Sequence, residues 1–382
     1  MYNIKELGQV FTPDFIVSEM LRLRKNFGRI LEPSSGAGAF AKNIPVCVSI
    51  EIDEKYCANG TLNIDFFDYP ISEKFETIVG NPPYVRYQDI SSDTKKKIKL
   101  NLFDERSNLY LFFIEKCINH LAENGELIFI TPREFLKATS SIKLNNFIYE
   151  QGTITDLIDL GDKKIFNGFT PNCIIFRFEK GNFSRQTNLH RRFVYSNGQL
   201  LFTNNDYSVV LKDIFSVKVG AVSGNDKIFT NDELGNADFV NSTTAKTGKT
   251  RRMIFNTHIP YLEQYKEKLL SRGIRKFSEN DWWQWGRLHH ISEQKRIYVN
   301  CKTRNKEPFF VQQCTNYDGS VLALFPNNQT LNECELCEKL NAVNWYELGF
   351  VCDGRYIFSQ KSLENTLLPD TFLEYRNKIE MF

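Results

Sequence analysis

The sequence lacks an export signal and a segment able to cross a membrane. Its first twenty residues carry Lys5, Glu6, Asp14 and Glu19 and contain no apolar core of the length that an export signal requires. No uncharged apolar run approaches the roughly 18 to 20 residues needed to cross a bilayer. These absences lead us to expect a soluble cytoplasmic protein with no membrane partner.

The cysteines lack the pattern of a disulfide framework or of a metal site. There are nine of them, an odd number, and several lie in apolar runs such as the one around Cys173. Cys334 and Cys337 form a single CxxC pair, whereas a zinc site needs a second pair at a compatible spacing. We therefore expect free thiols and no bound metal.

A strong charge of one sign is absent from the chain as a whole. Lys and Arg number 48 and Asp and Glu 46, which excludes a uniformly basic or acidic protein. Residues 246–306 differ, because fifteen basic residues stand there against five acidic ones, a net charge of +10. Three of the four tryptophans also lie in this segment. Arginine beside aromatic rings is typical of a nucleic-acid surface, although a solvated face and buried tryptophans are the alternatives.

The pattern that is present predicts two domains, the first of them α/β. A chain of 382 residues is too long for one ordinary domain and too short for three. Short β-rich runs alternate with amphipathic stretches in the first half, which indicates a largely parallel sheet. We expect strands at 29–31, 47–50, 77–79, 126–130, 155–160 and 172–178, a helix over 108–122 stopped by Gly125, and a hairpin over 193–202. Polar residues follow the hairpin, so we place the domains at 1–208 and 209–382.

The most informative stretch is the loop Gly80–Tyr84, which follows an expected strand. Two prolines fix its backbone and remove two donors, so their carbonyls stay free to accept hydrogen bonds. The side-chain oxygen of Asn81 and the carbonyl of Pro82 give two acceptors aimed at one point. Such a pair suits a planar amino group, and Tyr84 can stack on its ring. Asn-Pro-Pro turns are common in loops, so this motif alone does not establish a ligand site. The neighbouring segments have to show whether the loop binds a ligand.

Three neighbouring segments favour a bound nucleoside. The run 30–40 is a strand entering a glycine-containing turn, which lets the backbone approach a ligand. The run 49–53 ends a strand in acidic residues suited to ribose hydroxyls. The run 63–67 offers a carboxylate and an aromatic ring for an adenine. Each run alone can be explained as a turn, a capping acidic residue or a core phenylalanine. Together and in this order, the runs favour a nucleoside-binding site.

In this order the motifs resemble those of the amino-group DNA methyltransferases of the adenine-N6 type with the γ arrangement, the group of the TaqI modification methylase. The segment 8–13 corresponds to the motif that precedes the glycine loop, 81–84 to the catalytic NPPY motif, and 164–170 to the loop that receives the target base. The resemblance covers residues 1 to about 180. It implies a Rossmann-like S-adenosylmethionine-dependent methyltransferase domain with a mostly parallel sheet, followed by an α+β target-recognition domain.

The resemblance also implies roles for individual residues. The catalytic residues are Asn81, Pro82, Tyr84 and Phe166, with Phe166 stacking on a flipped adenine and Phe169 as its alternative. The residues that bind S-adenosylmethionine are Thr12, Glu32, Pro33, Ser34, Gly36, Gly38, Glu51, Ile52, Asp65, Phe66, Asn81 and Pro83. In the second half the similarity is less specific, and the candidates for DNA contact are Lys227, Arg251, Arg252, Trp285 and Arg287. The run Lys95–Lys99 is expected to be a solvated helix face, with contact to a phosphate as the alternative.

The function implied is methyl transfer to N6 of a flipped adenine in double-stranded DNA. The protein would act as a monomer near the nucleoid, either alone or beside a restriction endonuclease on a separate chain. The alternatives are RNA adenine methylation, protein glutamine methylation and a non-catalytic DNA-recognition subunit. The segment before the glycine loop and the basic second half favour DNA, and the intact NPPY motif favours catalysis. Because no Pro-Cys dipeptide occurs, a cytosine-5 enzyme with a cysteine nucleophile is disfavoured.

Overall fold

The computed structural model divides the chain into two compact units. One unit comprises Met1–Asn204 with Glu347–Asp353, and the other comprises Asn205–Tyr346 with Gly354–Phe382. The structure describes residues 10–161, 163, 165–166 and 172–376. The first division falls at Asn204, close to the expected 208. Residues 347–353 also belong to the first unit, and the composition of the sequence gives no indication of this.

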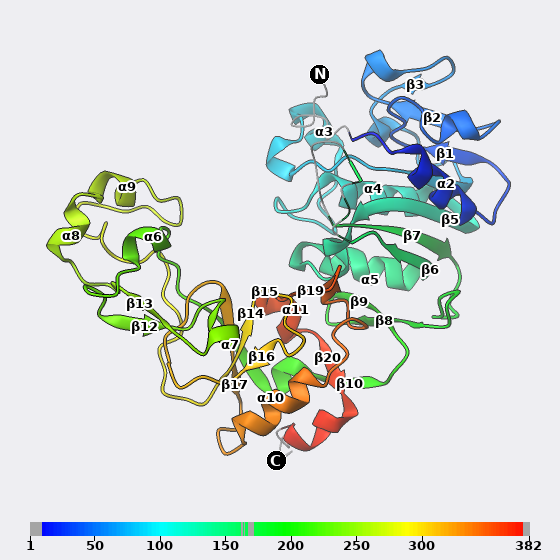
Figure 1. Cartoon of the computed structure of the whole chain (residues 1–382). Coiled ribbons are helices and arrows are strands. Elements are labelled where there is room, and N and C mark those ends of the chain that lie inside the picture. The colour runs from blue at the N-terminus through cyan, green and yellow to red at the C-terminus, as the bar shows by residue number, and fades with distance from the viewer. Residues whose placement is uncertain (1–9, 162, 164, 167–171, 377–382) are drawn as a thin grey trace. The chain divides into compact units, whose positions relative to one another are not determined.

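A seven-stranded sheet forms the first unit (Figure 1). Its order is β3-β2-β1-β4-β5-β7-β6, and all pairs are parallel except those that β7 makes with β5 and β6. The strands are β1 (Ile30–Glu32), β2 (Val48–Glu51), β3 (Leu62–Asn63), β4 (Phe75–Gly80), β5 (Leu121–Pro132), β6 (Gly152–Asp159) and β7 (Cys173–Lys180). The six strands expected from the sequence are thereby confirmed. Because β1, β2 and β4 are parallel, their carboxyl ends meet at one edge, where open α/β sheets bind ligands.

Alternating side chains of the central strands fill two apolar layers, one on each face of the sheet. Leu127 and Phe129 of β5 join a cluster with the helix α4 (Leu109–His120), whereas Ile128 and Ile130 join a cluster with α2 (Asp14–Arg22). Successive side chains of a strand point to opposite faces, which explains this partition. Within the described part of this unit, the other α-helices are α3 (Ser92–Lys97) and α5 (Ile142–Gln151).

The expected helix over 108–122 is confirmed as α4, but its end differs from the prediction. Asn108 caps the helix by accepting a hydrogen bond from the backbone of Tyr110, and β5 begins directly at Leu121. Gly125 therefore lies inside β5, and its interpretation as a helix stop was wrong. A Cβ at Gly125 would lie 3.0 Å from the carbonyl oxygens of Ala122 and Phe75, so close backbone packing requires glycine there.

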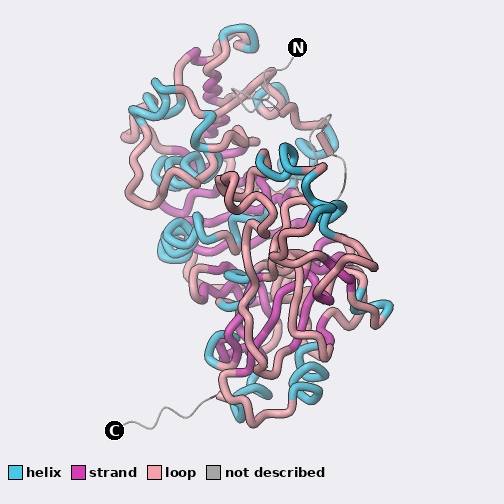
Figure 2. Tube along the Cα trace, turned by 90° about the vertical axis from the view of Figure 1, so that its left-hand side faces the viewer, coloured by secondary structure: helices cyan, strands magenta, loops and turns pink. Residues whose placement is uncertain are grey.

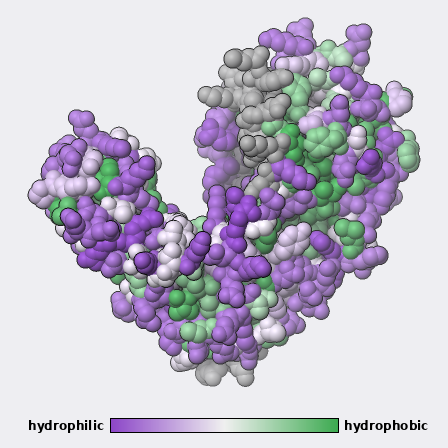
Figure 3. Space-filling model, in the orientation of Figure 1, coloured by the Kyte–Doolittle hydropathy of each residue, from purple (hydrophilic) through white to green (hydrophobic). Residues whose placement is uncertain are grey.

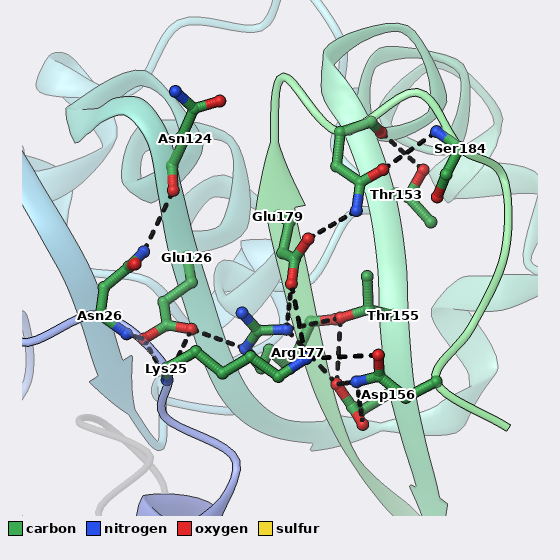
Figure 4. A network of polar contacts seen from close by, with 12 residues as sticks. Lys25, Asn26, Asn124, Glu126, Thr153, Thr155, Asp156, Arg177, Glu179 and Ser184 are labelled. Carbon is green, nitrogen blue, oxygen red and sulfur yellow. Dashed lines mark hydrogen bonds and ion pairs between the residues drawn. The ribbon is translucent and has the colours of Figure 1, made fainter.

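A buried ion pair connects Glu126 of β5 with Arg177 of β7, next to Thr155 of β6 (Figure 4). Glu126 is fully buried and accepts hydrogen bonds from Arg177 Nε at 2.6 Å, from Thr77 Oγ1 and from the backbone N–H groups of Lys25 and Asn26. Arg177 also donates to Thr155 Oγ1 at 2.8 Å. Buried charges are tolerated when they are paired and hydrogen bonded, and among the described residues neither Glu126 nor Arg177 has a fully buried side-chain polar atom without a partner.

Removing one member of this pair should destabilise the first unit strongly. Glu126→Ala leaves the guanidinium of Arg177 buried without its main partner, and we expect a loss of about 3–5 kcal/mol in the free energy of unfolding. Replacing both residues with methionine should cost less than the single change. Denaturant unfolding measures the difference, with Asp93→Ala at the exposed Lys96 pair as control. A Glu126→Ala protein as stable as the control would contradict this account.

The predicted hairpin around Asn197-Gly198 is also confirmed. It consists of β8 (Arg192–Ser196) and β9 (Gln199–Thr203). Asn197 and Gly198 have φ values of +48° and +84°, as a two-residue hairpin turn requires. A Cβ on Gly198 would come within 2.5 Å of Ile142, so the turn packs closely against α5.

Short antiparallel pairs and short helices, joined by long loops, make up the second unit (Figures 1 and 2). A four-stranded sheet of order β11-β17-β14-β16 is its largest element, formed by β11 (Phe215–Val219), β17 (Val321–Pro326), β14 (Ile297–Asn300) and β16 (Phe309–Phe310). The smaller strands are β10 (Tyr207–Val210), β12 (Ala237–Phe239), β13 (Arg251–Met253), β15 (Lys302–Thr303), β19 (Arg355–Ile357) and β20 (Leu367–Pro369), while β18 (Val351–Cys352) belongs to the first unit. The α-helices among its described residues are α6 (Asp226–Phe229), α7 (Thr244–Thr247), α8 (Pro260–Glu263), α9 (Lys266–Leu270), α10 (Glu333–Asn341) and α11 (Gln360–Glu364). This is the α+β arrangement that we expected.

None of the described helices is long and apolar enough to cross a membrane. Among the described residues, no three His, Cys, Asp or Glu side chains are grouped so that they could hold a metal ion. Cys334 and Cys337 both lie on α10, where Cys334 is exposed and Cys337 is buried.

Candidate active site

A pocket lies at the shared carboxyl edge of β1, β2 and β4. Most of the positions expected to bind the cofactor line it: Thr12, Glu32, Pro33, Ser34, Gly36, Glu51, Ile52, Asp65, Phe66, Asn81 and Pro83. Gly38 is the exception, because it lies outside the pocket wall. The sequence interpretation missed other lining residues, among them Phe11, Ile64, Ser91, Thr94, Leu109 and Phe113.

The glycine loop after β1 is held in place by a carboxylate from β2. Gly36 and Gly38 have φ values of +50° and +73°, a region that glycine enters without strain. The N–H of Gly36 donates to Glu51 Oε2 at 2.7 Å, and the N–H of Asp53 donates to Glu51 Oε1 at 2.9 Å. One buried carboxylate therefore joins the glycine loop to the turn after β2.

Glu32 braces the far end of the same loop. Its carboxyl group is buried and accepts hydrogen bonds from the N–H groups of Ala41 at 2.8 Å and Phe40 at 3.4 Å. Burial raises the pKa of Glu32 to about 8, and these backbone N–H groups offset only part of that effect. Glu32 is thus a support for the loop at the base of the pocket.

The raised pKa of Glu32 should make stability fall as pH rises. The folded chain holds the proton more tightly than the unfolded chain, so the free energy of unfolding should decrease from about pH 4.5 towards pH 8. Glu32→Gln cannot ionise and should flatten this part of the profile, whereas the exposed replacement Glu54→Gln should not. Urea unfolding at several pH values measures both effects. Parallel profiles for wild type and Glu32→Gln would contradict the prediction.

Asp65 and Phe66 form the part of the pocket that the sequence assigns to an adenine. Asp65 Oδ1 accepts from the N–H of Phe67 at 2.9 Å, and Oδ2 accepts from Thr94 Oγ1 at 2.8 Å. Lys97 adds an ion pair at 3.4 Å. The helix α3 therefore closes this side of the pocket, and the interpretation of Lys95–Lys99 as an entirely solvated face was wrong for Lys97.

The NPPY loop enters the pocket directly after β4. Asn81 Nδ2 donates to the carbonyl of Val10 and to Thr12 Oγ1, both at 3.1 Å, and the main-chain oxygen of Asn81 accepts from Ser34 Oγ at 3.2 Å. Asn81 Oδ1 is buried and has no hydrogen-bond partner within the described part of the chain. The side chain thus leaves its acceptor end available for a ligand.

Tyr84 and Phe166 lie beside each other below this loop. The hydroxyl of Tyr84 donates to the carbonyl of Ile130 at 3.0 Å, and its ring meets that of Phe166 edge-on, with centroids 6.4 Å apart. Burial raises the pKa of Tyr84 well above its ordinary value. Phe166 is 5% exposed and belongs to the apolar cluster that contains Val79 and Ile128. Phe169 lies outside the described residues.

The candidates for DNA contact occupy different environments in the second unit. Trp285 is 3% exposed, donates its indole N–H to the carbonyl of Ile254 and stacks on Phe239, so it is a core residue. Arg287 is exposed and donates to the carbonyl of Gly220. The other three are Lys227, which is exposed, Arg251, which faces Asp226 and Asp318 at 3.8 Å, and Arg252, which pairs with Asp238 at 3.0 Å.

The pocket chemistry fits S-adenosylmethionine. Ile52 and Ile64 are 48% and 37% exposed and line the same pocket as Glu51 and Asp65, which suits a planar ring with polar substituents. Ser35 Oγ, like Asn81 Oδ1, is a buried wall atom for which the described residues offer no partner. Apolar surface with unpartnered polar atoms at its margin is what a nucleoside cofactor requires.

The strand order, the glycine loop and this pocket define a Rossmann-like domain of the S-adenosylmethionine-dependent methyltransferase fold. Residues 40–166 match the model of the family described as Eco57I restriction-modification methylase. The chain is 33% identical over 188 residues to the type II methyltransferase M.HincII of Haemophilus influenzae, a match that covers 46% of this chain and 38% of that protein. It is 30% identical over 200 residues to M.TthHB8I of Thermus thermophilus, which covers 46% of each chain.

A solved structure extends the likeness to both units. The type IIL restriction-modification enzyme MmeI, determined in complex with DNA, aligns over 92% of this chain and 64% of its own with a TM-score of 0.61 and 11% identity. Residues 40–166 are therefore similar to the Eco57I restriction-modification methylase family, and the likeness to MmeI shows the fold. The expected resemblance to DNA methyltransferases, the fold class and the cofactor are confirmed. The matches span less than half the length of the curated relatives named here.

Proposed function

We propose that this chain transfers the methyl group of S-adenosylmethionine to N6 of an adenine in double-stranded DNA. The observation that carries the proposal is the orientation of Asn81, whose side-chain oxygen is buried at the cofactor pocket and lacks a partner in the described chain. An acceptor in this position suits an amino group with two hydrogens. The methylase domain supplies the matching cofactor chemistry.

The reaction needs positioning more than chemical activation by the protein. S-adenosylmethionine supplies an electrophilic methyl group on its sulfonium. Asn81 Oδ1 and the Pro82 carbonyl accept the two amino hydrogens, which draws the nitrogen lone pair out of conjugation and directs it towards the methyl carbon. The transfer would be a direct displacement with no covalent enzyme intermediate: the bond from N6 to the methyl carbon would form as the bond from sulfur to that carbon breaks, S-adenosylhomocysteine would leave, and N6 would lose one proton to solvent. Because N6 is stacked inside the duplex, the adenine must leave the helix, at a cost of a few kcal/mol.

Three observations support DNA as the substrate. The curated relatives are named type II methyltransferases, and the MmeI structure contains DNA. Residues 246–306 carry a net charge of +10. The part of the second unit with α8 and α9 presents mostly hydrophilic side chains on the face drawn in Figure 3. We propose Lys227, Arg251, Arg252 and Arg287 for DNA contact and leave out the buried Trp285.

The remaining parts of the proposal concern partners and location. Relatives of two kinds are found, since M.HincII is named as a methyltransferase and RM.Eco57I of Escherichia coli as both restriction enzyme and methyltransferase. We propose that this chain is a monomeric methyltransferase of a restriction-modification system, with any endonuclease on a separate chain. A DNA-modifying enzyme of this kind would work in the cytoplasm at the nucleoid.

Label transfer from tritiated S-adenosylmethionine distinguishes the candidate substrates. Separate reactions contain unmethylated duplex DNA, total RNA or a peptide-release factor. We expect label in DNA alone. Label in RNA or in the release factor would replace the proposed substrate, and binding of cofactor and DNA with no transfer to any acceptor would identify a non-catalytic recognition subunit.

A further inference from the structure

The catalytic asparagine is held by a segment far from it in sequence. Asn81 Nδ2 donates one hydrogen bond to the carbonyl of Val10 and one to Thr12 Oγ1, each 3.1 Å long. Thr12 is 9% exposed and immediately precedes Pro13, whose carbonyl accepts from the first turns of α2. The hydroxyl that holds Asn81 is therefore attached to the start of a packed helix.

The Val10 carbonyl determines which end of the amide faces the ligand, because it can only accept, whereas the Thr12 hydroxyl can accept or donate. The oxygen and nitrogen ends of an asparagine side chain have nearly the same shape, so hydrogen bonding decides between them. A flipped Asn81 would direct Oδ1 at the carbonyl of Val10, and two acceptors would then face each other. The observed orientation directs Oδ1 away from Val10 and Thr12, and this atom is the one that lacks a partner in the described chain. The site thus offers an oxygen to an N–H donor.

We infer that Thr12 is a positioning residue for Asn81. The Val10 carbonyl selects the orientation in which Asn81 Oδ1 accepts hydrogen bonds from the target amino group, and the Thr12 hydroxyl gives Nδ2 a second partner that restrains the amide in that orientation. This inference rests on the proposed function for the identity of that amino group. It also gives Thr12 a different role from the cofactor contact that the family resemblance implies.

The same segment contacts the glycine loop. The ring of Phe11 lies 3.6 Å from where a Cβ on Gly36 would be, and it packs on Tyr56 with ring centroids 5.4 Å apart. Phe11 and Thr12 are adjacent, so one short segment touches the cofactor side of the pocket through one residue and the catalytic loop through the next. Loss of the Thr12 hydroxyl should therefore affect Asn81 while the contacts of Phe11 remain.

Two replacements at position 12 separate positioning from cofactor binding. Thr12→Val keeps the shape and removes the hydroxyl, whereas Thr12→Ser keeps the hydroxyl. We expect kcat to fall about tenfold in Thr12→Val, the size of one hydrogen bond, with the KM and Kd for S-adenosylmethionine within about twofold of wild type. Thr12→Ser should restore kcat. The control is Thr153→Val, which removes another buried hydroxyl, hydrogen bonded to Asn182 outside the pocket, and should leave kcat unchanged.

A second readout needs no methyl acceptor. In protein labelled with ¹⁵N-asparagine, the Asn81 side-chain amide is assigned by its absence from the spectrum of Asn81→Ala. Its hydrogens should exchange with solvent more slowly in wild type and Thr12→Ser than in Thr12→Val. Equal exchange in all three proteins would overturn the inference. A weaker cofactor affinity with unchanged kcat in Thr12→Val would do so as well, because it would return Thr12 to the cofactor site.

Failure of the proposed function gives a different result. If wild type methylates RNA or protein instead of DNA, the proposed substrate is wrong, and the kcat ratios on that acceptor test the role of Thr12. If wild type methylates nothing, the exchange measurement alone decides whether Thr12 holds Asn81.

Discussion

Replacing Asn81 with alanine should lower the rate of methyl transfer at least a hundredfold and leave cofactor and DNA binding within about threefold of wild type. The alanine variant loses the unpartnered oxygen that we propose to orient the target nitrogen. Removal of one positioned polar group at a reacting centre costs on the order of 10²–10³ in rate. The backbone of the loop should persist, because the Ser34 hydroxyl bonds the main-chain oxygen of residue 81 and two prolines follow.

Single-turnover transfer of tritium from S-adenosylmethionine to duplex DNA measures this effect, with cofactor and DNA affinities determined separately. Asn146→Ala is the matched control, since its amide is exposed and bonds only to Glu150 among the contacts that the structure describes for it. Asn81→Asp keeps an acceptor but places a second oxygen opposite the Val10 carbonyl, so it should also be severely impaired. Loss of both affinities in Asn81→Ala together with activity would contradict the assigned role.

Replacing Glu51 with alanine should weaken binding of S-adenosylmethionine about 10- to 100-fold. Its two oxygens hold the N–H groups of Gly36 and Asp53, so the replacement releases the glycine loop and the turn after β2 together. A hydrogen bond to a charged group contributes about 1.5–3 kcal/mol, and the loop must then be ordered when the cofactor binds. Glu51→Gln retains one acceptor and should show an intermediate loss.

Calorimetric titration with S-adenosylhomocysteine measures the affinity without turnover. Glu54→Ala, three residues along the chain on the exposed surface, is the control and should bind as wild type does. An unchanged affinity in Glu51→Ala would show that neither loop depends on this carboxylate. If Glu51→Ala lowered the rate of methyl transfer without lowering the affinity for S-adenosylhomocysteine, Glu51 would act on the reacting groups and not in cofactor binding.

Much of the first unit could be predicted because its signals are local. A β-rich run that ends in Gly80-Asn81 or in Glu51 places those residues at the carboxyl edge of a parallel sheet whatever the details of packing. The turn at Asn197-Gly198 follows equally directly from the backbone freedom of two residues. The core positions of the pocket could therefore be identified from the order of motifs.

Other parts of the pocket and fold depend on contacts between distant segments. Thr94 and Lys97 belong to a polar, lysine-rich helix that resembles a surface element, and only the fold shows that they meet Asp65. The hydrogen bond from Asn81 to Thr12 likewise connects two residues that are far apart in the sequence and share no local pattern. Sequence periodicity carries no information on such pairs.

The sequence was equally unable to separate buried from exposed polar groups. Arg177 and Glu126 are charged residues of the kind that usually lies on the surface. In the structure both are buried in the core of the sheet. Arg133 donates to the carbonyls of Gly349 and Val351, which attaches 347–353 to the first unit through a residue more than two hundred positions earlier. Trp285 stands in a basic, aromatic stretch typical of a nucleic-acid surface, yet it fills the core of the second unit.

Nucleoside analysis of DNA modified by this protein tests the central claim most directly. Unmethylated duplex DNA is incubated with S-adenosylmethionine that carries a deuterated methyl group, then digested to nucleosides and examined by mass spectrometry, with modified positions located by sequencing. The account predicts a deuterated methyl group on N6 of deoxyadenosine, confined to one short sequence and absent with Asn81→Ala. A methyl group on cytosine, or label retained by Asn81→Ala at the wild-type rate, would contradict it.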